Sequence, residues 1–163
     1  NKTEQNEGKN SIDILQLKHS VIRSLRPAFR WKAVQGASGY VFSVFDVRGR
    51  LCFFMITDST EFVYNKPNLI RGQTYGWNVF AMAGGKILPE GEGDFSILER
   101  DRLNEVVRAE KSIREKYPED SSEQLIALAM LYHGYRLNDE AADIVRTLYQ
   151  KYPEGKFPDF PSN

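Results

Sequence analysis

Alternating hydrophobic and polar positions characterise the first hundred residues of this sequence. The clearest row consists of four hydrophobic positions separated by single residues: Tyr75, Trp77, Val79 and Ala81. One buried face of a β-strand requires this spacing, because successive side chains point to opposite faces. Leu69 and Gly72 precede the row and indicate a turn that leads into the strand.

Six further segments have the composition of short strands: 12–17, 26–33, 40–46, 51–56, 61–64 and 94–98. Turn residues separate them, including GASG at 36–39 and the glycines of two hairpin tips. The run PEGEG at 89–93 is interpreted as an interruption before the last strand. Seven short strands at this spacing predict an antiparallel β-sandwich.

Three motifs in this region occur in an order that resembles a known family. They are Phe29-x-Trp31, Gly36-x-x-Gly39-Tyr40-x-Phe42-x-Val44 and the row that begins at Tyr75. Together they resemble strands B, C and F of a fibronectin type III-like (immunoglobulin-like) sandwich, over residues 12–98. The resemblance implies that the Tyr75 hydroxyl bonds to upstream backbone and fixes the corner before its strand. It indicates a fold and very little about function.

From Glu99 onward the hydrophobic spacing becomes helical. A first helix is predicted to end at Pro118, and Ser121-x-x-Gln124 forms a capping box for a second. Asp139 is the predicted N-cap of a third helix. The sequence therefore predicts three helices after the sandwich.

The helical region contains an internal repeat. Residues 111–119 recur as 146–154, an offset of 35 positions that is close to the 34 of tetratricopeptide repeats. The hairpin 125–153 resembles one such repeat, although Arg136 stands where the repeat often has a turn glycine. One hairpin and one preceding helix are too few to bury a continuous core alone. The helices are therefore expected to pack on another part of the chain.

The strand pattern suggests a surface for that packing. If Tyr40, Phe42 and Val44 share the interior with the Tyr75 row, four side chains point outward from the same sheet: Val41, Phe45, Phe80 and Met82. The neighbouring run 51–56 is apolar on both faces, whereas Arg30 and Glu61 make the outside of the other sheet polar. An apolar outer face is either covered or binds a partner. We interpret it as covered by the helices, with a free interaction surface as the alternative.

The charge balance of the chain argues against two classes of binding partner. Lys+Arg and Asp+Glu are both 22, so the net charge is zero, which argues against nucleic acid and anionic lipid as partners.

The single cysteine, Cys52, lies in an apolar run and is interpreted as an inert thiol near the core. No apolar segment approaches the roughly 20 residues of a membrane span. Residues 1–10 are polar and are interpreted as a disordered lead or a tether to an upstream anchor.

Motifs of catalysis and cofactor binding were not found. The sequence has only His19, in a predicted loop, and His133 with one cysteine, so no metal site is predicted. It contains no Gly-x-Ser-x-Gly elbow, phosphate loop or dinucleotide fingerprint. No catalytic residue and no cofactor is therefore assigned. Trp31 and Trp77 belong to the predicted core rather than to a sugar-stacking platform.

These observations predict an α+β multidomain chain: a lead at 1–10, a fibronectin type III-like sandwich at 11–98, a tetratricopeptide-like appendage at 99–155 packed on it, and a Pro-rich tail at 156–163. Phe157 and Phe160 of the tail either fold back or protrude. The expected function is a non-catalytic protein-interaction or scaffold module with an unidentified protein partner. The combination resembles the extracytoplasmic parts of bacterial envelope proteins, and this resemblance implies a periplasmic or envelope location. A carbohydrate-binding domain that uses exposed aromatic residues is the alternative, and an enzyme is the least favoured interpretation.

Overall fold

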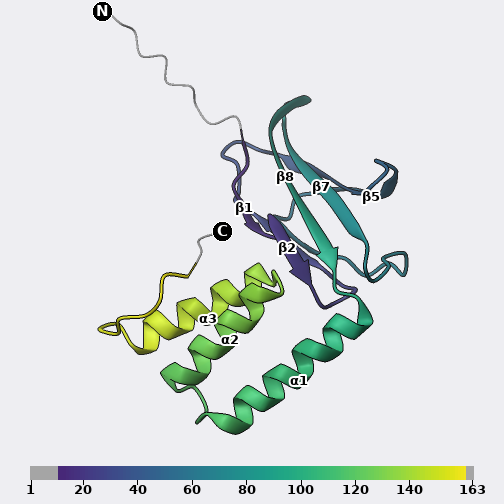
Figure 1. The fold of residues 1–163 in the computed structure, drawn as a ribbon. Coiled ribbons are helices and arrows are strands. Elements are labelled where there is room, and N and C mark those ends of the chain that lie inside the picture. The colour runs from purple at the N-terminus through teal and green to yellow at the C-terminus, as the bar shows by residue number, and fades with distance from the viewer. Residues whose placement is uncertain (1–10, 161–163) are drawn as a thin grey trace, which may run out of the picture. The chain divides into compact units, whose positions relative to one another are not determined.

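The computed structural model describes residues 11–160 and contains eight strands and three helices within this range (Figure 1). The strands are β1 (Ile14–Gln16), β2 (His19–Ile22), β3 (Ala28–Trp31), β4 (Gly39–Asp46), β5 (Leu51–Thr57), β6 (Glu61–Val63), β7 (Thr74–Ala83) and β8 (Lys86–Ile97), and the helices are α1 (Arg100–Lys116), α2 (Ser122–Gly134) and α3 (Asn138–Lys151). The predicted lead at 1–10 lies outside the described residues.

The described chain divides into two compact units. The first comprises residues 11–18, 26–68 and 74–94. The second comprises His19–Leu25, Leu69–Gln73 and the chain from Phe95 onward, which includes all three helices.

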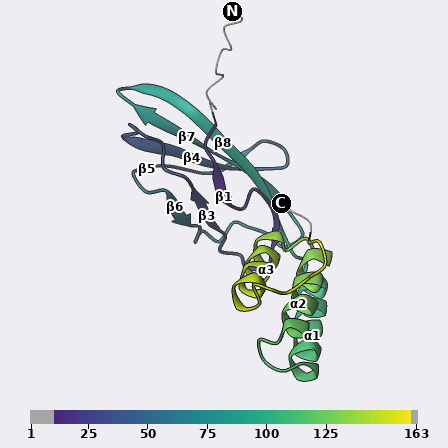
Figure 2. The ribbon, with the colours of Figure 1, turned by 90° about the vertical axis from the view of Figure 1, so that its left-hand side faces the viewer.

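The strands form two sheets. One has the order β1-β3-β6 and the other the order β2-β8-β7-β4-β5. In the first unit the two layers face each other (Figure 2). Phe29 of β3 contacts Phe42 of β4 and Trp77 of β7, with ring centroids 4.9 and 5.2 Å apart. These edge-to-face contacts join the layers into a β-sandwich, so the predicted α+β class with a sandwich is confirmed.

The predicted alternation of side chains holds on both central strands. Each of the four residues in the Tyr75 row is at most 4% exposed. Tyr40, Phe42 and Val44 are buried to the same extent and pair with β7 in antiparallel register. The hydrogen bond that the family resemblance implies for the Tyr75 hydroxyl stays a prediction.

The PEGEG segment does not interrupt a strand, which corrects the sequence interpretation. It lies inside β8. A Cβ atom on Gly93 would stand 2.5 Å from the Leu17 carbonyl oxygen and 2.8 Å from Trp77 Nε1. A Cβ atom on Gly91 would stand 2.7 Å from Ile14 Cδ1. These glycines are needed for close approach of neighbouring groups and not for a turn.

A second correction concerns the start of the sandwich. The predicted strand 12–17 is shorter, because Leu17 adopts a φ of 60° and ends it. The indole Nε1–H of Trp77 donates to the Leu17 carbonyl at 2.8 Å. His19, expected in a loop, begins β2, which belongs to the other sheet. The chain therefore changes sheets at Leu17.

We predict that Gly93→Ala destabilises the protein by about 1–3 kcal/mol, because the added methyl group overpacks the space between Leu17 and Trp77. Gly76→Ala is the matched control, since a Cβ atom there meets nothing within 4 Å. Urea denaturation of both variants measures the difference. Equal stability of the two variants would contradict this account of β8.

In the second unit, Ser121 caps α2 as predicted, whereas Gln124 does not bond back to the Ser121 N–H as a complete capping box requires. The Gln124 N–H donates to Ser121 Oγ at 3.2 Å. The Gln124 side chain, 2% exposed, accepts from the Asp120 N–H and donates to the Tyr117 carbonyl. The glutamine thus satisfies backbone groups on both sides of the turn that joins α1 to α2.

The 35-residue repeat corresponds to equivalent helix ends. The Tyr117 N–H bonds to the Ile113 carbonyl at the end of α1, and the Tyr152 N–H bonds to the Leu148 carbonyl at the end of α3. Arg136 has a φ of 59°, in the left-handed region where glycine is most at ease. The sequence departs from the repeat at Arg136 in residue type, while its backbone adopts a glycine-like conformation.

The helical core includes residues that precede the helices in sequence. Its buried members are Leu98, Val106, Leu128, Tyr132, Leu137 and Ala141. Val21 of β2 packs against this cluster. The α2–α3 turn also covers the free edge of β2: the Val21 N–H donates to the Arg136 carbonyl at 2.9 Å, and Asn138 Nδ2 donates to the His19 carbonyl at 2.8 Å.

An ion-pair network joins the segment after β2 to the helices. Arg23 Nη2 lies 2.6 Å from Glu110 Oε1 of α1, and the same guanidinium donates to both carboxylate oxygens of Glu140 of α3. The Tyr132 hydroxyl donates to Glu110 at 2.5 Å, and the Arg23 guanidinium stands 5.0 Å from the centroid of the Tyr132 ring. Burial opposes ionisation of Glu110, but hydrogen bonds from Arg23 and Tyr132 outweigh it and lower its pKa.

We predict that Glu110→Gln lowers the free energy of unfolding by about 1–3 kcal/mol at neutral pH, as loss of a hydrogen-bonded charge does. Because the folded-state pKa of Glu110 lies below its ordinary value of 4.5, its stabilisation is complete above that pH and is lost as the pH falls through the folded-state pKa. Denaturation measurements from pH 7 to pH 3 should therefore show the free energy of unfolding of the unsubstituted protein approaching that of the Glu110→Gln variant. The control is Glu115→Gln, on the exposed side of α1. A difference in unfolding free energy between the unsubstituted protein and Glu110→Gln that stays constant down to pH 3 would contradict the prediction.

The tail folds back at one of its two phenylalanines. The Phe157 ring contacts Tyr149 and Tyr152 of the α3 region, with centroids 5.5 and 6.5 Å apart. Of the two alternatives left open by the sequence, the first therefore applies to Phe157. Residues 161–163 lie outside the described residues.

Candidate functional site

The outward face of strands β5, β4 and β7 carries the four predicted site residues. Three cross-strand rows run over it: Ile56–Val41–Phe80, Phe54–Ser43–Asn78 and Leu51–Phe45–Gly76. Met82 stands opposite Gly39 at the end of the face. Val41 and Phe80 are direct neighbours, and all four predicted residues are half-buried. We call this surface, including Leu51, Phe54 and Ile56, the outer apolar face.

The most exposed part of the outer apolar face was not assigned from the sequence. Leu51, Phe54 and Ile56 of β5 are 58, 52 and 65% exposed. The sequence analysis noted that this run is apolar on both faces, and that was the available signal. It named no residue there, because alternation on β5 alone does not distinguish inward from outward positions.

The centre of the outer apolar face is polar. Ser43 is 6% exposed and stands opposite Asn78. Asn78 Oδ1 is buried and has no hydrogen-bond partner among the described residues. Neither side chain has a charged group beside it in the cross-strand rows, so the face offers van der Waals contact rather than acid–base chemistry.

Cys52 lies at a β-bulge beside this face. The register of β4 and β5 shifts between Val44 and Phe45, which leaves Cys52 without a partner in the pairing. Burial raises the pKa of the Cys52 thiol, and the charge of Asp46 adds to this effect. The thiol is therefore protonated at neutral pH and is a poor nucleophile.

Asp46, at the β4–β5 hairpin, has a structural role. Its carboxylate accepts from the backbone N–H groups of Arg48 and Arg50 and from Arg50 Nε. The bond from the Arg50 N–H contributes most to lowering the pKa of Asp46. The ionised aspartate thus fixes the hairpin turn.

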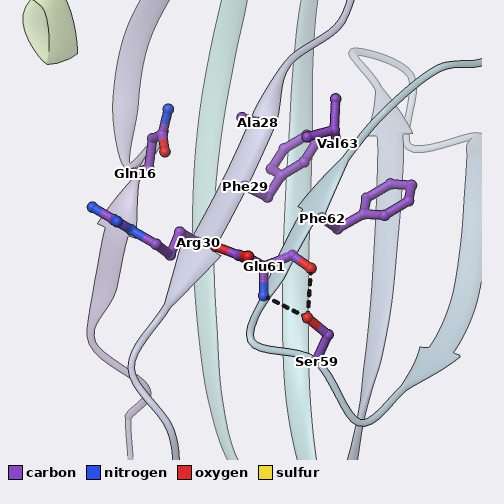
Figure 3. A pocket seen from close by; sticks show the side chains of 8 residues that line it. All are labelled: Gln16, Ala28, Phe29, Arg30, Ser59, Glu61, Phe62 and Val63. Atoms are coloured by element: carbon purple, nitrogen blue, oxygen red, sulfur yellow. Dashed lines mark hydrogen bonds between the residues drawn. The ribbon is translucent and has the colours of Figure 1, made fainter.

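A pocket of about 440 Å³ lies on the other sheet (Figure 3). Gln16, Arg30 and Glu61 form a polar cross-strand row along it. The Ser59 hydroxyl, also in the lining, donates to the Glu61 carbonyl and accepts from the Glu61 N–H, as the dashed lines in Figure 3 show. Because this hydroxyl is bonded to backbone, it is not paired with a side-chain base and is not an activated nucleophile.

Metal and membrane features were also searched among residues 11–160. This range contains no group of three or more His, Cys, Asp or Glu side chains placed to hold a metal ion. His19 and His133 are both exposed, on β2 and on α2. None of the three described helices is long and apolar enough to cross a membrane.

Comparisons with known proteins give likenesses to solved structures only. No protein-family model matches the sequence, and the comparison with curated proteins gives no match. A Fn3-like protein from Clostridium thermocellum is 18% identical over 55% of this chain and 90% of that chain, with a TM-score of 0.38. CopC from Methylosinus trichosporium OB3b is 14% identical over 55% of this chain and 95% of that chain, with a TM-score of 0.37.

A third solved structure is similar over more of the chain. The beta-1,2-glucanase from Parabacteroides distasonis is 8% identical over 90% of this chain, with a TM-score of 0.42. This chain spans 24% of the length of that chain. No functional assignment follows from these likenesses.

Proposed function

We propose that this chain is a non-catalytic protein-interaction or scaffold module whose partner binds the outer apolar face. The observation that supports the proposal is the exposure of Leu51, Phe54 and Ile56, each more than half exposed, beside four half-buried apolar neighbours. Contiguous apolar surface of this kind marks interaction sites on soluble proteins. The outside of the other sheet carries Arg30 and Glu61 and lacks this character.

The composition of the face suits a protein partner. Removing one Phe or Ile side chain from water contributes about 1.5–3 kcal/mol. A few such side chains at the centre of an interface supply most of its binding energy. From the sequence, coverage of Val41, Phe45, Phe80 and Met82 by the helices is preferred and a free interaction surface is the alternative, and that coverage stays a prediction.

The helices form the scaffold part of the proposal and are proposed to be tetratricopeptide-like. The matching ends of α1 and α3, 35 residues apart, support this. So does the left-handed conformation of Arg136 in the α2–α3 turn. Ala129 and Ala141 are both buried in this hairpin, where small side chains let two helices approach closely.

We also propose an extracytoplasmic location in a bacterial envelope, on the resemblance of the domain combination to envelope proteins. The zero net charge is compatible with a role that involves neither nucleic acid nor a lipid surface. A fusion to alkaline phosphatase, which is active only outside the cytoplasm, tests the location. An inactive but intact fusion made from the natural full-length gene would reject it.

Carbohydrate binding is the second candidate and has less support. A sugar site needs an aromatic platform with polar groups arranged around it. Trp31, Trp77, Tyr40 and Tyr75 are all buried, at most 4% exposed. Phe45 and Phe80 stand among apolar neighbours on the outer apolar face.

Site-specific photo-crosslinking tests the proposed function. A benzophenone amino acid at position 80 is expected to give a discrete protein adduct in cells that express the natural gene. The same amino acid at position 63, on the polar side of the other sheet and 58% exposed in the native protein, is the control and should give none. No adduct at position 80, or the same adducts at both positions, would reject the proposal.

A glycan array separates the remaining alternatives. We expect no binding, because the polar side chains between the rows of Phe45 and Phe80 are a buried Ser43 and a half-buried Asn78. A bound glycan that is lost in both Phe45→Ala and Phe80→Ala would favour the carbohydrate alternative. Turnover of a hydrolase substrate that a single Asp or Glu substitution abolishes would show an enzyme.

A further inference from the structure

The pocket on the three-stranded sheet is a hollow around a small side chain. Ala28 of β3 stands opposite Val63 of β6, and both belong to the lining. Phe29, between Ala28 and Arg30, is 1% exposed and points into the sandwich, so Ala28 and Arg30 point outward. The pocket volume of about 440 Å³ lies at the lower end of the range for ligand sites, about 300–1,000 Å³, which suits a small molecule.

Two opposite charges line this pocket without pairing with each other. Arg30 and Glu61 are direct cross-strand neighbours, and both are exposed. Within the described range neither side chain forms an ion pair or a side-chain hydrogen bond. In Figure 3 the Arg30 guanidinium lies on the Gln16 side of the pocket, with Glu61 on the opposite side. An exposed ion pair between them would contribute little, so a ligand that contacts both charges has only weak competition.

We propose that this pocket binds a free dipeptide, with the ligand carboxylate on Arg30 and the ligand ammonium group on Glu61. A guanidinium binds a carboxylate through two parallel N–H···O bonds, and a carboxylate accepts from an ammonium group. Adjacent strands lie about 4.8 Å apart, so charges on the β1 and β6 sides of the sheet are separated by about 5–10 Å. Two residues span about 7 Å, whereas the two charges of a single amino acid lie closer together.

The remaining lining suits the middle of a dipeptide. The side-chain amide of Gln16 both donates and accepts, as a peptide bond requires of its partner. Ala28 and Val63 offer apolar contact to small ligand side chains. The two aromatic residues of the lining favour a sugar less, because Phe29 is buried, Phe62 is half-buried, and neither presents an exposed ring for stacking. The pocket and the outer apolar face lie on different sheets, so this proposal and the proposed function can fail independently.

Titration of the full chain with L-alanyl-L-alanine, followed by the NMR shifts of backbone amides, tests the proposal. We expect shifts on β1, β3 and β6 and a dissociation constant of about 1 mM. Ala28→Leu fills the hollow and should weaken binding at least about tenfold. Ala33→Leu, at an exposed alanine outside the lining, is the matched control and should leave binding unchanged. No shift with 10 mM dipeptide, or equal weakening in the two leucine variants, would overturn the proposal.

Blocked dipeptides assign the two charges. N-acetyl-L-alanyl-L-alanine keeps the carboxylate, and L-alanyl-L-alanine amide keeps the ammonium group. Arg30→Gln should weaken binding of the first at least about fivefold and leave the second unchanged, and Glu61→Gln should do the reverse. Lys32→Gln, at the next outward cation after Arg30, is the control and should change neither. Equal effects of Arg30→Gln and Glu61→Gln on both ligands, or tighter binding of D-glucose than of L-alanyl-L-alanine, would overturn the proposal.

Discussion

The hydrogen bond from the Trp77 indole to the Leu17 carbonyl is the constraint on which the arrangement of the sheets depends. It fixes a residue whose φ of 60° is unfavourable for a leucine, at the point where the chain leaves β1 and enters the sheet of β2. Gly93 makes the bond possible, since any side chain there would collide with both groups. This single polar contact in an apolar core therefore contributes strongly to the stability of the fold, because an unpaired buried indole N–H or carbonyl would cost about 1–3 kcal/mol.

The position of β2 determines how the helical unit is built. As an edge strand, β2 has one row of backbone groups that needs partners, and the α2–α3 turn supplies them. Arg23 then extends from the end of this segment to carboxylates on two helices. The backbone bonds fix the register of the turn against β2, and the half-buried Arg23 guanidinium makes separation costly because its charge and that of Glu110 would be left unpaired. The two kinds of contact act on the same short segment of chain.

Local pattern predicted most of the elements but not the long-range contacts that use them. It was wrong for the start of the third helix, where Asp139 lies inside α3 and Leu137 is the N-cap. The period-2 rows around Tyr40 and Tyr75 identified the core faces, because alternation depends only on neighbours in sequence. The sequence interpretation of PEGEG as an interruption is wrong, since composition does not distinguish a glycine that breaks a strand from one that makes room for a distant carbonyl. β2 was missed because its four residues, HSVI, are too few to show a period. At the candidate site, Val41 and Phe80 followed from parity, whereas the outward side of β5 required knowledge of the register with β4.

We propose that the helical hairpin is a tetratricopeptide-like motif that is stable outside an array. In stacked repeats each hairpin buries its apolar surfaces against the next, and about three are needed. Here α2 buries Leu125, Leu128, Ala129 and Tyr132, so it needs neighbours on more than one side. Helices α1 and α3 supply two of them, and Val21 and Leu98, from strand-associated segments, complete the cluster. Residues from strand-associated segments thus complete the core around the helices, which explains why the second unit includes parts of the chain that precede its helices by many residues.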